Sequence, residues 1–140
     1  MHNKDIIKIS DTFLKKLTFN FSFISKNYSV DYKNLDKSNA RNVLKKLVKA
    51  SSVDYEVLLE QKNIEYIPKK EMREDMMSIP PEFKRTGRYD KCSTNYVVIK
   101  GSDLRIIGKI NPVSKIFYIL AIDVNFELYD HGKHKGAHRS

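Results

Sequence analysis

Three apolar runs near the end of the chain limit its fold more than any other feature. They are NYVVIK at 95–100, DLRIIGKI at 103–110 and KIFYILAID at 115–123, with the turn-forming GSD and NPVS between them. Apolar runs of this length, punctuated by Gly, Asn, Pro, Ser and Asp, predict consecutive hairpins. We therefore expect an antiparallel β-meander. The last run is apolar on both faces, which predicts an interior strand covered by helices on one side.

The first half of the chain predicts a strand followed by a helix. LTFNFSFI at 17–24 alternates apolar and polar residues strictly, as a half-buried strand does. Between 35 and 52 the apolar residues recur at helical spacing instead. Asp36 or Ser38 can cap the start of this helix.

A second helix and a long loop follow. SVDYEVLLEQKN at 52–63 predicts the helix, with Ser51 or Ser52 as its cap. Residues 63–95 are the least regular part, and the Pro80–Pro81 pair argues against regular helix there because each ring removes a backbone donor. The predicted fold class is α+β, with an N-terminal strand, two helices and then a C-terminal antiparallel β-meander whose helices pack on one face.

The balance of charge indicates an acidic partner. The 140 residues include 26 Lys and Arg against 17 Asp and Glu, so the net charge is +9. This excess attracts polyanions over long range, and phosphate backbones are the commonest polyanions in cells. We expect RNA or DNA as the partner. A membrane surface and a merely solvated lysine-rich surface are the alternatives.

Composition and length also indicate the cellular compartment and the number of domains. No stretch approaches the ~20 apolar residues that span a bilayer, and the N-terminus has no signal-peptide core. The single cysteine, Cys92, excludes an intramolecular disulfide and fits a reducing cytosol. We expect a cytoplasmic protein with no membrane partner, in which Cys92 is an inert thiol. Its length predicts one domain at 1–130, followed by a flexible basic tail at 131–140.

Two basic segments are candidate nucleic-acid contacts. The helix predicted at 35–52 carries four cations opposite its apolar stripe: Arg41, Lys45, Lys46 and Lys49. The loop sequence KRTGRYDK combines cations with an aromatic ring and a flexible Gly87, which suits phosphate contact and base stacking. Its candidate residues are Lys84, Arg85, Arg88 and Tyr89. A solvated basic surface is the alternative for both segments.

The C-terminal histidines raise the question of a metal. His131, His134 and His138 lie three and four residues apart, a spacing at which imidazoles on one helix can share a metal. Two glycines interrupt any helix here, so we expect a flexible basic terminus, no metal and no cofactor. His131 stays a candidate because it directly follows ELYD, and Asp123 or Asp130 is the nearest group to set its tautomer.

The element order and the stretch NYVVIKGSDLRIIGKINPVSKIFYILAID resemble the RelE/ParE superfamily of toxin–antitoxin toxins, in pattern over residues 17–123. The resemblance implies metal-independent RNA cleavage by attack of a 2′-hydroxyl on the neighbouring phosphate. It implies a catalytic set of Arg105, Lys109 and His131. In this set Arg105 and Lys109, which alternation places on one strand face, bind the phosphate, and His131 and His134 act as base and acid. An acidic antitoxin protein is the implied partner. The alternative for Arg105 is an exposed strand residue beside Asp103.

A second resemblance involves RIIGKI and FYILAIDVNFELYDHG. Together they resemble short, largely uncharacterised proteins of bacteria and their mobile elements. We therefore carry a second functional hypothesis, a non-catalytic nucleic-acid- or protein-binding accessory protein. The chain has no Gly-rich phosphate loop, paired-carboxylate signature or Cys/His zinc pattern, which argues against nucleotide hydrolases, glycosidases and zinc fingers. The sequence leaves the oligomeric state open.

Overall fold

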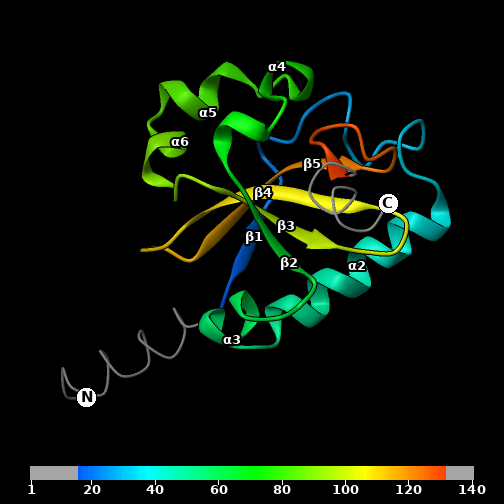
Figure 1. The fold of residues 1–140 in the computed structure, drawn as a ribbon, viewed down its shortest axis with the longest axis horizontal. Helices are drawn as coiled ribbons and strands as arrows, with labels where there is room; N and C mark the ends of the chain where they lie inside the picture. Colours follow the sequence, from blue (N-terminus) through cyan, green and yellow to red (C-terminus); the bar gives the residue numbers. More distant parts are fainter. Residues whose placement is uncertain (1–15, 132–140) are drawn as a thin grey trace.

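The computed structural model describes residues 16–131, which build one five-stranded sheet (Figure 1). The strands lie in the order β1-β5-β4-β3-β2. Their bounds are Thr18–Asn20 for β1, Ile64–Ile67 for β2, Tyr96–Lys100 for β3, Arg105–Asn111 for β4 and Ile116–Asp123 for β5. With helices packed on this sheet, the α+β class predicted from the sequence is confirmed.

Strands β2 to β5 pair antiparallel in chain order, which confirms the predicted meander. β1 pairs with β5 in parallel, and Phe19 lies opposite Phe117. β5 therefore has a neighbour on both sides, as its two-sided apolar sequence predicted. It is buried from Phe117 to Asp123.

Helix α2, Lys37–Ser51, covers one face of the sheet. Asp36 caps it by accepting a hydrogen bond from the backbone N–H of Asn39 at 2.8 Å, so the first of the two predicted caps is correct. Three of its side chains are buried among the strand residues, at helical spacing: Val43, Leu47 and Ala50. This face also holds the second predicted helix.

That helix, α3, is shorter than predicted and spans Tyr55–Leu59. It begins after Asp54 rather than at Ser51 or Ser52, because α2 continues through Ser51 and uses Ser52 as its C-cap. Leu58 joins the same core cluster as the buried side chains of α2. The two predicted helices therefore lie on one face of the sheet.

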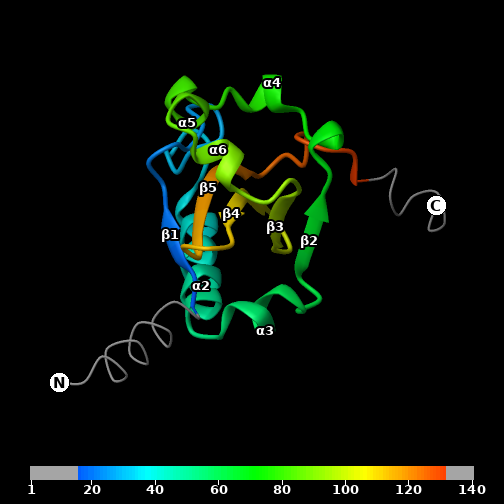
Figure 2. The same ribbon diagram turned by 90° about the vertical axis from the view of Figure 1, so that its left-hand side faces the viewer.

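The segment predicted as a long loop folds into short helices over the opposite face (Figure 2). These are η1 at Lys69–Glu71, α4 at Glu74–Met77, α5 at Pro81–Arg85 and α6 at Arg88–Lys91. Pro81 begins α5 instead of breaking it, since the first helical position needs no backbone donor. Phe83 and Tyr89 are buried against the strands. Both sheet faces are thus covered.

β5 ends at Asp123, where the sequence changes from apolar to polar. The Asp123 side chain is 0% exposed and accepts hydrogen bonds from three backbone N–H groups, those of Asn125, Glu127 and Leu128. These donors replace the water that a buried carboxylate loses. Leu128 and Tyr129 then return to the core, so the chain after Asp123 is not simply a surface segment.

Within residues 16–131, no helix combines the length and the apolar character needed to cross a membrane. Of the tail predicted at 131–140, the structure describes His131 alone. His134 and His138 lie outside the described residues.

Candidate nucleic-acid interface

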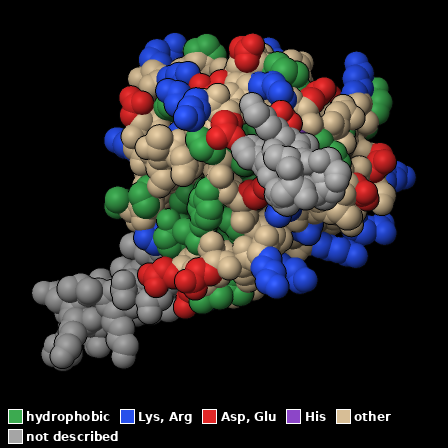
Figure 3. Space-filling view, in the orientation of Figure 1, with side chains coloured by type: hydrophobic (Ala, Val, Ile, Leu, Met, Phe, Trp, Pro, Cys, Tyr) green, Lys and Arg blue, Asp and Glu red, His purple; other side chains and the backbone are tan. Residues whose placement is uncertain are grey.

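The outward side of α2 carries charge of one sign. The helix contains no acidic residue and five cations: Lys37, Arg41, Lys45, Lys46 and Lys49. None of the ion pairs that join residues within 16–131 involves α2. At about 1.5 Å per residue, these charges are spread along about 18 Å of helix, from Lys37 to Lys49. Figure 3 shows Lys and Arg side chains gathered at the lower right, where α2 lies in Figure 1.

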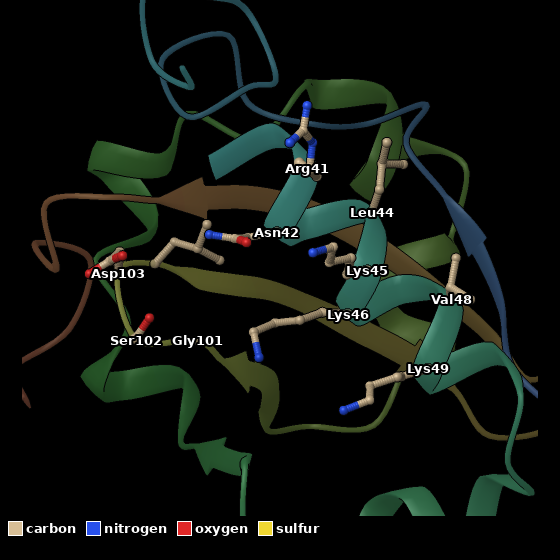
Figure 4. A pocket seen from close by; sticks show the side chains of 11 residues that line it. Arg41, Asn42, Leu44, Lys45, Lys46, Val48, Lys49, Gly101, Ser102 and Asp103 are labelled. Carbon is tan, nitrogen blue, oxygen red and sulfur yellow. The ribbon is translucent and has the colours of Figure 1, made fainter. Parts of the chain in front are cut away.

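A groove of about 590 Å³ runs beside this helix (Figure 4). Four of the five α2 cations line it, and its far wall is the β3–β4 turn at 101–104. Asn42, Lys46 and Lys49 point from the helix toward that wall. Gly101 leaves room for Lys46, since a Cβ at Gly101 would lie 2.7 Å from the Lys46 Cε. Among the residues that line this groove, Asp103 is the only acidic one.

A second hollow of about 480 Å³ continues the first. The two share Lys46, Val48 and Lys49 in their linings. The second is closed by Gln61 and Asn63, which lie between α3 and β2, and by residues of α3 and β3. We refer to the two hollows together as the α2 groove. Both hollows have α2 as their basic wall.

Apolar side chains stand among the cations of α2. Leu44 and Val48 are each 64% exposed, although both are large hydrophobic residues. They lie four residues apart and therefore adjoin on the helix surface. Leu44 and Val48 therefore form a small exposed apolar strip beside the cations of α2.

The other predicted basic segment forms α5 and α6 on the opposite face. Three of its four cations have a partner within the described residues: Lys84 lies 3.9 Å from Glu74, Arg85 donates to Glu82 at 3.1 Å, and the Arg88 guanidinium lies 5.3 Å from the ring centroid of Phe23. The fourth cation, Lys91, is exposed at the end of α6. Tyr89 is only 7% exposed and packs edge-on against Phe83. The sequence predicted an exposed stacking residue there, and burial of the ring contradicts that detail.

Lys109, predicted to bind phosphate, is 2% exposed. Its Nζ lies 4.2 Å from the ring centroid of Tyr89 and 5.0 Å from that of Tyr96. Burial lowers the pKa of Lys109, because a low-dielectric site disfavours the ammonium form. The Lys84 ammonium also lies over the Tyr89 ring, at 4.7 Å from its centroid. The structure thus brings Lys84, Tyr89 and Lys109 together, but around a buried ring.

Glu74 connects this cluster. The hydroxyls of Tyr89 and Tyr96 both donate to its carboxylate. Burial by itself raises the pKa of Glu74, but the two tyrosine hydrogen bonds and the nearby lysine ammonium groups outweigh it, so its pKa lies below the ordinary value. We name Glu74, Tyr89, Tyr96 and Lys109 the Glu74 network.

Arg105 and His131 lie elsewhere. Arg105 begins β4, four residues before Lys109, which places the two about 13 Å apart along the strand. Its guanidinium donates to the Gly101 carbonyl at 2.6 Å and lies 4.7 Å from the ring centroid of Phe126. The His131 ring is 5.3 Å from the same Phe126 ring, centroid to centroid. Two of the three residues predicted to be catalytic therefore share a cluster, and Lys109 is separate.

The structure also separates the two basic segments. Arg41 and Lys45 lie on α2, which packs on one sheet face, whereas Lys84, Arg85 and Arg88 lie over the other. No residue of α5 or α6 lines the α2 groove. The sequence analysis did not predict that the β3–β4 turn at 101–104 forms the opposite wall of the groove. For the basic wall on α2, the absence of any acidic residue between Asp36 and Asp54 was a usable signal.

Comparison with models of protein families, with curated proteins and with solved structures finds no match to this chain. The resemblance to RelE/ParE toxins therefore stays a prediction, and function has to be argued from the site. Among residues 16–131, no three or more His, Cys, Asp or Glu residues are grouped so as to hold a metal ion.

Proposed function

We propose that this chain is a non-catalytic nucleic-acid-binding protein that holds a phosphate backbone along the α2 groove. One observation carries the proposal: α2 presents five cations with no acidic residue and no ion pair within the described chain. Nucleic acid carries a layer of condensed counterions, and unpaired lysines and arginines that neutralise its phosphates release those ions, which contributes binding free energy. The cytoplasm is the compartment that fits this proposal, since nucleic acid is present and a lone thiol stays reduced.

RNA cleavage is not part of the proposal. Lys109 is too buried to meet a phosphate, and Arg105 and His131 lie at the other end of β4. Phosphate binding along α2 needs none of these three residues. An acidic protein partner, such as an antitoxin, would compete for the same basic groove.

The test is a salt titration with fluorescently labelled RNA and DNA, followed by fluorescence anisotropy. Four phosphate contacts predict that log Kobs falls with log salt at a slope of about −3, because each contact contributes about 0.7 to 0.9. RNA recovered from the same samples should be intact on a denaturing gel. Absence of binding at low salt contradicts the proposal, and RNA cut by the pure protein favours the enzyme hypothesis instead.

A further inference from the structure

We propose that the α2 groove takes a single nucleic-acid strand rather than a duplex. This inference rests on the proposed function and names the substrate class of the same site. Its basis is the lining of the groove, which has two walls of different chemistry and exposed apolar side chains. A convex basic helix alone would suit a duplex equally well.

The two walls differ in chemistry. On the α2 side, Lys46 and Lys49 line both hollows and point across the groove (Figure 4). On the opposite side, Ser102 lines the first hollow and Gln61 and Asn63 line the second. Cations on one side suit phosphates, while hydroxyl and amide groups on the other suit the hydrogen-bonding edges of bases.

The groove also holds exposed apolar side chains. Leu44 lines the first hollow and Val48 lines both, and each is 64% exposed. Unpaired bases have free faces that gain from contact with such side chains, whereas the faces of paired bases are already stacked within the duplex. A single strand can therefore use this apolar surface in a way that a duplex cannot.

The length of the groove sets the size of the site. Helix α2 spans about 22 Å. Modules that bind single strands cover about 4–16 nucleotides, and a wall of this length corresponds to the short end of that range. The contacts are to backbone and to apolar surface, so we expect little dependence on base sequence.

The experiment compares a labelled 12-nucleotide single strand, as RNA and as DNA, with the matching duplexes at one salt concentration by anisotropy. We expect the single strands to bind about tenfold more tightly than the duplexes. Ser102→Phe fills the first hollow without changing charge, and should reduce single-strand affinity about tenfold while duplex affinity stays the same. Gln61→Phe does the same in the second hollow, and Ser22→Phe, on an exposed loop outside the groove, is the control.

The outcomes separate this inference from the proposed function. If no nucleic acid binds, the proposed function fails. If duplexes bind as tightly as single strands, or if both groove-filling variants fold by circular dichroism and leave single-strand affinity unchanged, the inference is wrong and backbone binding along α2 stands. Equal losses for single strand and duplex in these variants also overturn it.

Discussion

The two basic surfaces of this protein differ in how their charges are compensated. On α2, five cations face solvent without an acidic residue or an ion pair among the described residues. Over the other face, Lys84 and Arg85 have carboxylates and Lys109 is enclosed by Tyr89 and Tyr96. The contrast teaches that cations of equal number can differ in how fully the protein compensates them. The proposed polyanion site is therefore placed at the uncompensated cations of α2.

The largest expected effect is a loss of folding stability when the Glu74 network is disrupted. Glu74→Ala leaves the buried hydroxyls of Tyr89 and Tyr96 without their acceptor, and should lower the free energy of unfolding by about 2–4 kcal/mol. Urea unfolding measures this. Glu82→Ala, which removes a carboxylate from an exposed ion pair on the same face, should cost less than about 1 kcal/mol. Equal costs would contradict the assigned role of Glu74.

The same carboxylate predicts a dependence on pH. The pKa of Glu74 is lower in the folded protein than in the unfolded chain, so its contribution is complete above the unfolded value of about 4.5 and is lost as pH falls through the folded pKa. Glu74→Gln removes this proton-binding difference. Its unfolding free energy should therefore fall less steeply than that of the parent protein below about pH 5. If the unfolding free energies of Glu74→Gln and the parent protein fall equally steeply below about pH 5, folding does not lower the pKa of Glu74.

A smaller effect is expected at the α2 groove. Asp103 is the one carboxylate that lines the first hollow, and its charge opposes a phosphate there. Asp103→Asn should raise nucleic-acid affinity about two- to threefold with little change in stability. Asp75→Asn makes the same charge change over the other face and should leave affinity within about 1.5-fold of the parent protein. Similar gains for both variants would indicate an effect of net charge alone.

The smallest effect is expected at Gly101. A Cβ at this position meets the Cε of Lys46, which is the far end of a flexible side chain and can move. Gly101→Ala should therefore weaken nucleic-acid binding by less than about twofold and leave the unfolding free energy nearly unchanged. In a Lys46→Gln background the same substitution should have no effect on binding, because the displaced cation is absent. An undiminished loss in that background would mean that Gly101 acts through other groups.

The fold was largely predictable because its signals are local. The meander follows from three apolar runs with turn residues between them, and α2 follows from helical spacing after Asp36. The short helices of residues 69–91 were not predictable, since each is one turn or little more and depends on packing. Phe83 and Tyr89 hold them on the sheet. Pro81 was misjudged because its effect depends on whether it starts a helix or interrupts one.

The site was predictable only in part. The basic stripe of α2 follows from spacing, so the sequence places Arg41 and Lys45 on one face of the helix. The groove was not predictable, because it depends on how the β3–β4 turn lies against the helix, a contact between distant segments. Tyr89 was misjudged for a related reason. An aromatic ring between cations suggests an exposed stacking residue, whereas here its hydroxyl binds Glu74 and its ring is buried.

The most direct test of the central claim compares two fourfold variants of equal charge. One carries Arg41→Gln, Lys45→Gln, Lys46→Gln and Lys49→Gln on α2, and the other carries Lys84→Gln, Arg85→Gln, Arg88→Gln and Lys91→Gln on α5 and α6. Each lowers the net charge by four, from +9 to +5. For the α2 variant, the slope of log Kobs against log salt should change from about −3 to nearly zero. The α5–α6 variant should keep most of the parent protein's slope. Loss of binding in the α5–α6 variant, with the α2 variant unaffected, would contradict the account.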